Sequence, residues 1–396
     1  MTTFCGGLDA ARHALREHFG HRSFRIDQLR VIGPLLAGLD VLAVLPTGAG
    51  KSLCFQIPAL MADGLTLVIS PLISLMQNQV GALRRRRIAA AYLNSLLAPD
   101  QQRAILEAAL TGRLKLLYCA PERLSALVRR LTRARTPVSL LAVDEAHCIV
   151  EWGNEFRPLY RRLGKYRYLL GNPPTLALTG SATAATRAEI LRVLRLPRAE
   201  VVVTSFDRPN LTFAVERVRD DRGRFARVHE LIRRATGSSI VYAPTRRLTE
   251  LVTRALLLRS VRAAPYHAGL AGAMRRQVLA DFLANRAPVV VATSAFGMGI
   301  DKSDVRRVIH WGPPRTLESY YQEAGRAGRD GRPAECLILW TPADFEWGQG
   351  TRETRAYVES RACRRRRLLE YFGERLGQCN GCDRCAAGGA KGMLKR

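Results

Sequence analysis

Lysine is scarce in this 396-residue chain, although basic residues are abundant. The sequence has 62 lysine and arginine residues against 34 aspartate and glutamate residues, which makes the formal net charge +28. The only lysines are Lys51, Lys115, Lys165, Lys302, Lys391 and Lys395. Almost all of the positive charge is therefore arginine, which indicates a polyanionic partner. A GC-rich genome that favours arginine codons would explain the same excess, so charge alone does not establish nucleic-acid binding.

Long hydrophobic runs and a leader sequence are also missing. Residues 1–20 contain no basic segment followed by an apolar core, so we expect no secretory signal. The longest apolar stretch, 65–76, is interrupted by serines and Pro71 and is too short to cross a bilayer. We therefore expect a soluble cytoplasmic protein, associated with the nucleoid if the source is bacterial. A repeat of solenoid period is absent as well.

Short β-branched apolar runs alternate with amphipathic stretches from about Asp40 onward. The runs are 41–45, 65–69, 114–118, 140–143 and 175–178, then 239–242, 289–292, 307–310 and 336–339. Continuous apolar strands joined by helices predict an α/β fold with parallel sheets covered on both faces.

The alternation pauses at residues 205–221, a charged stretch that contains Asp-Arg-Pro-Asn and that we interpret as a linker. The sequence therefore predicts one lobe over 1–205 and a second lobe over 206–342. A charged helical region without strands follows over 343–396 and leads into a cysteine cluster.

A phosphate-binding loop is predicted at residues 45–52, between an apolar strand and a helical segment. Its glycines let backbone N–H groups approach phosphate oxygens, and the helix N-terminus adds positive potential. Lys51 would reach the β- and γ-phosphates of ATP, and the Ser52 hydroxyl would coordinate Mg²⁺. The loop residues assigned to nucleotide binding are Thr47, Gly48, Ala49, Gly50, Lys51 and Ser52. A glycine-rich turn with a solvated lysine is the alternative interpretation.

Two further segments complete the predicted ATP site. Asp144 and Glu145 end an apolar strand, where Asp144 would hold Mg²⁺ and Glu145 would orient the attacking water. Arg326 and Arg329, in the second lobe, would neutralise charge that develops on the γ-phosphate. The alternative for Asp144 and Glu145 is an acidic helix N-cap after a strand, and the two arginines taken by themselves indicate solvated charges. Their occurrence downstream of a phosphate loop favours the catalytic roles.

At these motifs the chain resembles the RecQ family of superfamily-two DNA helicases, over about residues 19–385. The resemblance implies two RecA-like lobes of the P-loop NTPase type and a small zinc-binding module. It also implies that Phe19, Arg25 and Gln28 recognise adenine. Residues 70–76 resemble the motif that contacts the DNA backbone, with Ser70 and Pro71 as its binding residues. Residues 181–183 resemble the motif that couples hydrolysis to strand movement, and the resemblance places Gly299, Asp301 and Gln322 at the nucleotide.

The segment after the acidic pair resembles the aromatic-rich loop of the same family. Aromatic faces stack on bases, and the resemblance makes Trp152, Phe156, Arg157 and Tyr160 a DNA-binding set that signals to the ATP site. The spacing of four between the three aromatic residues is equally consistent with the core face of a helix.

Four cysteines near the C-terminus have the spacing of a metal site. Cys363 is followed after fifteen residues by Cys379, Cys382 and Cys385, and four thiolates complete a tetrahedral zinc site. Gly381 would permit the tight turn between ligands. Disulfides and an iron–sulfur cluster are the alternatives. The arginines of 364–367 predict a helix with a basic face beside this site.

The sequence is therefore expected to encode a DNA helicase or translocase that uses ATP, Mg²⁺ and Zn²⁺, and the resemblance implies 3′–5′ polarity. The resemblance implies single-stranded and tailed duplex DNA as substrates, a monomeric state, roles in repair and recombination, and single-stranded-DNA-binding or repair proteins as partners. It also implies a short form without the winged-helix and helical domains of many relatives, which leaves efficient unwinding open. An RNA helicase and a DNA-binding or annealing scaffold with a regulatory ATPase are the alternatives.

Overall fold

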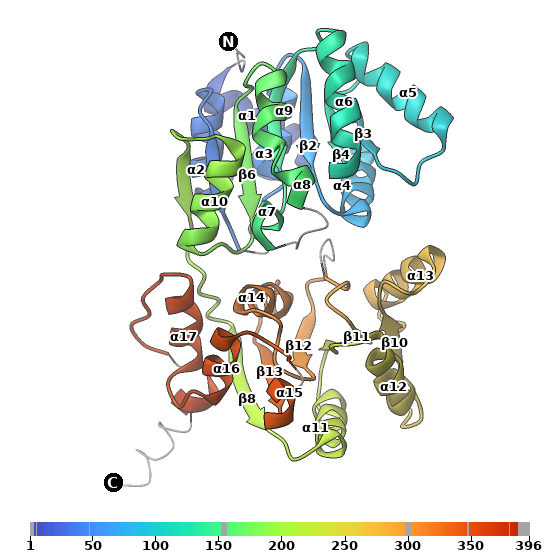
Figure 1. The fold of residues 1–396 in the computed structure, drawn as a ribbon, viewed down its shortest axis with the longest axis vertical. Coiled ribbons are helices and arrows are strands. Elements are labelled where there is room, and N and C mark those ends of the chain that lie inside the picture. The colour runs from blue at the N-terminus through green and yellow to red at the C-terminus, as the bar shows by residue number, and fades with distance from the viewer. Residues whose placement is uncertain are drawn as a thin grey trace. The chain divides into compact units, whose positions relative to one another are not determined.

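The computed structural model describes residues 4, 6–46, 48–151, 157–297, 302–346, 348–379 and 381–386, with the side chains of 151, 157 and 158 left outside this description. The chain divides into two compact units, Met1–Ser205 and Phe206–Arg396 (Figure 1). Within the described part, no helix has both the length and the apolar character that crossing a membrane requires.

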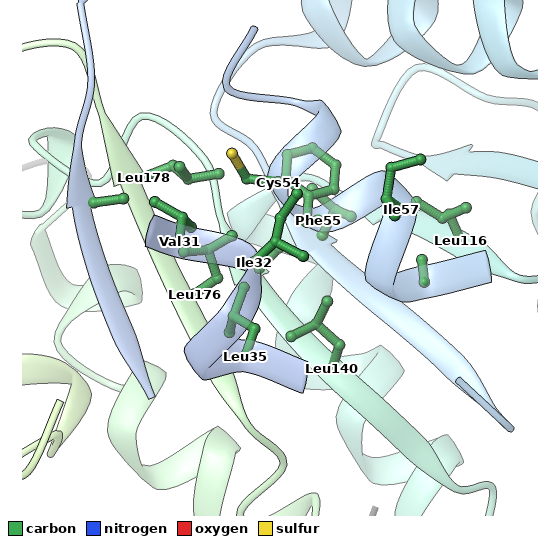
Figure 2. Close-up of a cluster of buried hydrophobic side chains, with 14 of the residues drawn as sticks. Val31, Ile32, Leu35, Cys54, Phe55, Ile57, Leu116, Leu140, Leu176 and Leu178 are labelled. Carbon is green, nitrogen blue, oxygen red and sulfur yellow. The ribbon is translucent and has the colours of Figure 1, made fainter. Parts of the chain in front are cut away.

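Unit 1 is built on a parallel sheet of seven strands in the order β3-β4-β2-β5-β6-β1-β7. The strands are β1 (Val41–Val44), β2 (Leu65–Ile69), β3 (Ala90–Leu93), β4 (Leu116–Cys119), β5 (Val138–Val143), β6 (Thr175–Thr179) and β7 (Glu200–Val203). Successive side chains enter opposite faces, because Leu176 and Leu178 join one buried cluster whereas Ala177 joins another. The first cluster packs α2 and α3 against the sheet (Figure 2). Burial on both faces explains the continuous apolar runs of the sequence.

Helices cover both faces of this sheet (Figure 1). They are α1 (Gly7–Phe19), α2 (Ile26–Leu36), α3 (Leu53–Met61), α4 (Ile73–Arg85), α5 (Pro99–Leu110), α6 (Pro121–Arg133), α7 (Cys148–Glu151), α8 (Arg157–Tyr160), α9 (Leu163–Leu169) and α10 (Ala184–Leu194). The neighbouring strands β2, β5, β6 and β1 all end at the same edge of the sheet. This edge is where an open parallel sheet binds ligands, and the predicted motifs follow these four strands.

Unit 2 contains a second parallel sheet, with six strands in the order β10-β11-β9-β12-β13-β8. The strands are β8 (Leu211–Arg217), β9 (Ser238–Tyr242), β10 (Ala263–Tyr266), β11 (Val289–Ala292), β12 (Val305–His310) and β13 (Ala334–Trp340). The prediction of a linker over 205–221 is wrong for residues 211–217, because β8 occupies them. Leu211, Phe213 and Val215 are buried while the residues between them face outward, which is the pattern of an edge strand.

The helices of unit 2 continue into the C-terminal region, where no further strands occur among the described residues. They are α11 (Asp221–Arg233), α12 (Arg246–Leu257), α13 (Gly272–Leu283), α14 (Leu317–Ala324), α15 (Pro342–Glu346), α16 (Arg352–Glu359) and α17 (Arg364–Tyr371). The cysteine segment bonds to the free edge of β8, since Phe213 N donates to Gly381 O at 3.0 Å. The cysteine cluster is therefore an extension of the unit 2 sheet.

Candidate functional site

The phosphate loop follows β1 and adopts a backbone that requires glycine. Gly48 and Gly50 have φ values of 88° and 76°, in the left-handed region that residues with a Cβ atom disfavour. Helix α2 holds this loop, because Arg25 donates from its guanidinium to Gly48 O. Lys51 Nζ donates to Leu45 O at 3.3 Å, so its ammonium lies over the loop. The chain therefore forms a preorganised cradle for phosphate oxygens.

Gln28 is buried beside this loop. Its Nε2 donates to Ala49 O and to Gly50 O at 3.2 Å each, and its Oε1 accepts from Arg25 N at 2.9 Å. Recognition of adenine by Gln28 stays a prediction, and it requires the amide to exchange a loop contact for the base. Phe19, also predicted at the base, is half-buried and carries the Arg86 guanidinium 5.5 Å above its ring.

Asp144 lies at the end of β5 with a 5% exposed side chain. Burial and then the neighbouring Glu145 carboxylate raise its pKa to about 7, whereas the Lys51 charge acts in the opposite direction. Lys51 and Asp144, 93 positions apart, are therefore electrostatic neighbours in one site. A divalent cation beside Asp144 would favour the ionised carboxylate that a magnesium ligand needs.

Three polar residues, of which Gln56 and Tyr118 are buried and Gln79 is half-buried, support Asp144 and were not predicted from the sequence. Gln79 Nε2 lies 3.5 Å from Asp144 Oδ2, and Tyr118 donates to Gln79 Oε1 at 2.8 Å. Gln56, from the helix that follows the phosphate loop, donates to the Tyr118 hydroxyl at 3.2 Å. This chain connects α3, β4 and α4 to the acidic pair. Gln56 and Gln79 are polar residues inside helices, which is a weak sequence signal, whereas Tyr118 lies in strand β4 and carries no such signal.

Glu145 has a strained backbone and a defined partner. Its φ is 50°, which is uncommon for a residue other than glycine. Its carboxylate lies 3.4 Å from His147 Nδ1, and that same nitrogen lies 2.9 Å from Thr179 Oγ1. Thr179 donates in turn to Ser181 O at 3.0 Å. The predicted coupling segment 181–183 is thus joined to the acidic pair inside unit 1.

Several predicted residues lie outside the described part of the chain, namely Thr47, Trp152, Phe156, Gly299, Asp301 and the side chain of Arg157. Their assignments stay predictions. The assignment of Tyr160 to base stacking is wrong for this conformation, because the side chain is 0% exposed in the core of unit 1. Of the three aromatic residues, Tyr160 therefore follows the alternative interpretation of a helix core face.

Ser70 and Pro71 follow β2, where the sequence predicted contact with the DNA backbone. The side chain of Ser70 is only 1% exposed, which disagrees with the predicted contact between its hydroxyl and the DNA backbone. Its burial follows from its place at the end of a central strand. Pro71 is half-buried, and its contact with DNA stays a prediction.

The arginine motif follows α14 in unit 2. Arg326 is 7% exposed and lies against the backbone of Gly297, where a Cβ atom would stand 2.7 Å from its Nη2. Arg329 and Gln322 are half-buried. Two nearby residues were not predicted: Glu323 accepts from, or donates to, His310 Nε2 at 2.8 Å, and both are buried. Arg326 is therefore a positioned cation rather than a solvated charge.

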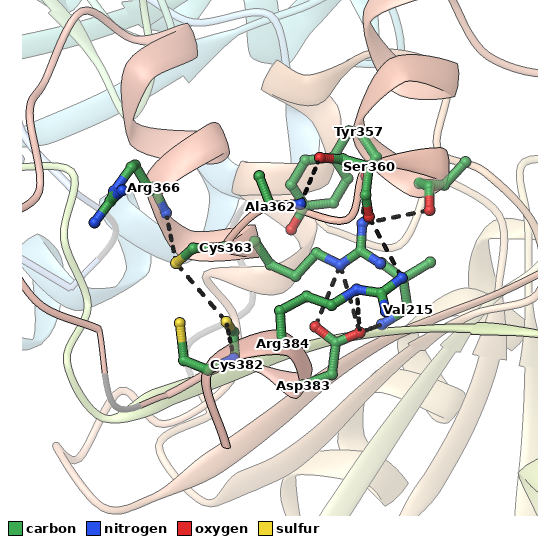
Figure 3. A network of polar contacts seen from close by, with 12 residues as sticks. Val215, Tyr357, Ser360, Ala362, Cys363, Arg366, Cys382, Asp383 and Arg384 are labelled. Carbon is green, nitrogen blue, oxygen red and sulfur yellow. Dashed lines mark hydrogen bonds and ion pairs between the residues drawn. The ribbon is translucent and has the colours of Figure 1, made fainter. Parts of the chain in front are cut away.

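The four predicted cysteines converge. The sulfurs of Cys363, Cys379, Cys382 and Cys385 all lie within 4.8 Å of one another. Zinc–sulfur bonds of about 2.3 Å place tetrahedral ligands about 3.8 Å apart, and the Cys363 and Cys382 sulfurs are 3.8 Å apart (Figure 3). Cys363 is the N-cap of α17, where its sulfur accepts from Arg366 N at 3.4 Å. The donor set therefore fits a structural zinc ion.

The electrostatics of the cluster also suit metal binding. Burial raises the pKa of the Cys382 thiol, but hydrogen bonds from the backbone of Cys385 and Arg364 outweigh this and bring the pKa to about 7. Cysteine is a metal ligand as the thiolate. The site thus has one sulfur that ionises readily at neutral pH.

The prediction of a basic face over 364–367 holds for only part of the helix. Arg364 and Arg365 are 1% and 4% exposed. Arg364 Nε donates to Asp383 Oδ1 at 3.2 Å, and Asp383 follows Cys382 directly in the chain. Arg366 and Arg367 remain exposed. Two of the four arginines therefore serve packing, because each finds a carboxylate or carbonyl partner inside unit 2.

Comparison with protein families matches three segments of the chain. Residues 25–191 match the DEAD/DEAH box helicase family, and residues 223–331 match the helicase conserved C-terminal domain. Residues 348–386 match the RecQ zinc-binding family. The two-sheet architecture is also that of the Mycobacterium smegmatis helicase Lhr solved with ssDNA and AMP-PNP, at a TM-score of 0.64 and 25% identity over 81% of this chain and 46% of that one. The fold and site therefore define a protein of the two-lobed helicase class.

Curated relatives give the family. The ATP-dependent DNA helicase RecQ of Haemophilus influenzae is 43% identical over 95% of this chain and 63% of its own length. The ATP-dependent DNA helicase RecQ of Bacillus subtilis is 40% identical over 95% of this chain and 67% of its own length. The chain belongs to the RecQ family, and it spans about two thirds of the length of these relatives.

Proposed function

We propose that this chain is an ATP-dependent 3′–5′ DNA helicase or translocase. One observation carries the proposal: Lys51 of the phosphate loop and the Asp144–Glu145 pair form a single electrostatic site at the carboxyl edge of the unit 1 sheet. A buried acidic pair beside a lysine-bearing phosphate loop is the arrangement that hydrolysis of a Mg²⁺-nucleotide needs. The relatives are named as ATP-dependent DNA helicases, which favours DNA as the polymer.

The roles in hydrolysis are divided among residues of unit 1. Lys51 binds the terminal phosphates, Ser52 and Asp144 hold Mg²⁺, and Glu145 orients the attacking water. Positive φ at Gly48 and Gly50 supports this assignment, because left-handed residues let neighbouring backbone N–H groups bind one anion. The bound Mg²⁺ neutralises charge on the phosphates when nucleotide is present.

The remaining roles belong to unit 2 and to the loop after Glu145. Arg326 and Arg329 stabilise charge on the γ-phosphate, with Gln322, Gly299 and Asp301 beside the nucleotide. Trp152, Phe156 and Arg157 bind single-stranded DNA and signal its presence to Glu145. The zinc cluster has a structural role. The family further supports a monomeric cytoplasmic enzyme of repair and recombination that meets single-stranded-DNA-binding proteins.

The first test is the steady-state ATPase rate with no nucleic acid, with single-stranded DNA and with single-stranded RNA. Wild type should respond to DNA, and Lys51→Ala should lower the rate at least about 100-fold, because a positioned donor to the transition state is lost. Lys165→Ala is the matched control, since Lys165 is an exposed lysine of the same unit. Preferential stimulation by RNA would identify an RNA helicase instead.

A second assay distinguishes an ATP-driven helicase from a DNA-binding scaffold. Release of a labelled strand from duplexes with a 3′ or a 5′ tail should require ATP and a 3′ tail. DNA binding without ATP-dependent release from either duplex would favour a scaffold whose ATPase regulates attachment. Because the chain spans about two thirds of its relatives, translocation on single-stranded DNA should be measured in parallel with unwinding.

A further inference from the structure

The segment before β8 binds the loop that carries the arginine motif. Arg208 Nη1 lies 3.3 Å from Gly325 O, and Nη2 lies 3.2 Å from Ala327 O and 3.0 Å from Gly328 O. Asn210 Nδ2 donates to Gly328 O at 2.8 Å and to Arg332 O at 2.9 Å. Two side chains of one four-residue turn, 207–210, therefore bind the loop 325–332 through five hydrogen bonds.

Arg208 and Asn210 bind the backbone that follows the C-terminal end of α14. The last carbonyl groups of a helix have no partner inside the helix, and a cation at that end is favourable. Arg208 places its charge just beyond the end of α14 at Ala324 and donates to carbonyls of the residues that follow the helix. Gly328 has a φ of 57°, and a Cβ atom there would stand 2.4 Å from Asn210 Nδ2. The backbone on both sides of Arg326 is thus held in one conformation.

Helix α17, whose N-cap is Cys363, binds the turn 207–210 through Arg365. Arg365 Nη1 donates to Asp207 Oδ1 at 2.6 Å and to Arg208 O at 2.9 Å. Its Nη2 donates to Pro209 O at 3.4 Å and to Leu211 O. Because Arg365 is only 4% exposed, these bonds lie inside unit 2, largely protected from water.

Helix α17 also packs directly on α14. The Tyr371 hydroxyl donates to Glu318 at 2.6 Å, and Phe372 and Tyr321 have ring centroids 5.0 Å apart. Phe206, at the start of unit 2, stacks on Phe372 at 4.5 Å and receives the Tyr321 hydroxyl on its carbonyl at 2.9 Å. The helix of the cysteine module, the turn 207–210 and the arginine motif form one contiguous polar and aromatic assembly.

We propose that Arg208 is a positioning residue for hydrolysis, which fixes Arg326 through the loop 325–328 and is itself oriented by Arg365. Arg208 touches no nucleotide in this role and acts only through the loop backbone. The inference rests on the proposed function, because it assumes that Arg326 stabilises charge during hydrolysis. It adds that the cysteine module contributes to catalysis through α17 and not only to folding.

The test is a double-mutant cycle on the ATPase with single-stranded DNA present, using Arg208→Ala, Arg326→Ala and the double variant. Arg208→Ala should lower kcat about tenfold or more with the KM for ATP changed less than about twofold, because displaced transition-state donors affect kcat. In the Arg326→Ala background the same substitution should have little further effect on kcat. Arg208→Lys, which keeps the charge and part of the carbonyl contacts, should recover an intermediate kcat.

Control variants and stability measurements distinguish a loss of positioning from a loss of folding. Arg352→Ala removes an exposed arginine from the same unit and should retain wild-type kcat. Each variant is compared by thermal unfolding and by metal content, and kcat is measured below the onset of unfolding. Undiminished kcat in Arg208→Ala overturns the inference, as does a loss of equal size with and without Arg326. Wild-type kcat in Arg326→Ala would instead overturn the role proposed for the arginine motif, and the inference with it.

Discussion

The Nδ1 atom of His147 lies 2.9 Å from Oγ1 of Thr179, at the end of the neighbouring strand β6. The same ring nitrogen is 3.4 Å from the Glu145 carboxylate, and Thr179 continues the chain of contacts to Ser181 O. His147 and Thr179 are both buried. Thr179 therefore joins the residue proposed to orient water to the segment proposed to couple hydrolysis with movement, within one rigid sheet edge.

Replacement of Thr179 by valine should uncouple this connection. The change keeps the shape of the side chain but removes the hydroxyl that lies 2.9 Å from His147 Nδ1, and loss of such a contact costs about 1–3 kcal/mol for a buried polar group. We expect a lower DNA-stimulated kcat with little change in the KM for ATP. Urea unfolding and the ATPase assay measure the two effects.

Thr66 offers a matched control for this substitution. It is a fully buried threonine of β2 in the same sheet, and its Oγ1 has no hydrogen-bond partner among the described residues. Thr66→Val should leave both stability and kcat near wild type. Equal losses in the two variants would show that the effect comes from packing rather than from the His147 contact.

Gly381 should not tolerate a methyl group. A Cβ atom there would stand 2.5 Å from Arg365 Nη2 and 3.1 Å from Leu211 O, without any positive φ at this residue. The sequence suggested a tight turn as the reason for this glycine, but the close approach of Arg365 is the physical cause. Gly381→Ala should destabilise unit 2 by about 1–3 kcal/mol, as overpacking does.

Gly377 provides the comparison on the other side of Cys379. A Cβ atom at Gly377 would meet no heavy atom within 4 Å. Thermal unfolding should therefore separate the two alanine variants, with Gly377→Ala close to wild type. A Gly381→Ala protein as stable as Gly377→Ala would contradict the close approach of Arg365.

Strand prediction from the sequence succeeded or failed according to the place of the strand in its sheet. The four strands that were not predicted, β3, β7, β10 and β8, are the edges of the two sheets. Central strands are buried on both faces and read as continuous apolar runs, whereas edge strands tolerate charge and proline. Glu216 and Arg217 end β8, and Pro265 lies inside β10. In β8 and β10, charge and proline therefore removed the signal.

The predicted sites divide in a similar way. Residues in short contiguous motifs, such as those of the phosphate loop and the cysteine cluster, could be identified because their chemistry requires a fixed spacing. Supporting contacts could not, because Gln79 meets Tyr118 and Arg208 meets Gly328 only after folding. Tyr160 shows the opposite failure, since a period of four does not distinguish a buried helix face from a stacking surface.

The cysteine cluster should bind one zinc ion per chain. Cys363→Ala removes one of four ligands and should lower zinc content after purification, measured by atomic absorption or by a colorimetric chelator. Cys336→Ala is the control, because burial raises the pKa of the Cys336 thiol to about 12 and its sulfur is not among the four that lie within 4.8 Å of one another. Iron in the purified protein, together with absorption by the protein in the visible range, would identify an iron–sulfur cluster instead.

The two glycines of the phosphate loop separate backbone strain from side-chain contact. Gly48 and Gly50 both have positive φ, so alanine at either position costs about 1–2 kcal/mol of strain in the loop. A Cβ atom at Gly48 meets nothing within 4 Å, whereas one at Gly50 would stand 2.5 Å from Gln28 Nε2. Gly50→Ala should therefore weaken ATP binding more than Gly48→Ala, because it also displaces the Gln28 amide.

Equilibrium titration with a fluorescent ATP analogue measures this difference. Adding Gln28→Ala to Gly50→Ala should remove the steric part and bring affinity toward that of Gly48→Ala combined with Gln28→Ala. Both double variants should bind the analogue more weakly than wild type. This shared loss of affinity measures the backbone strain at the glycine position together with the lost Gln28 contacts. If Gly48→Ala and Gly50→Ala bind the analogue equally well, the Gln28 amide moves aside for the methyl group with no loss of affinity. Contact between α2 and the loop would then not set the geometry of the phosphate cradle.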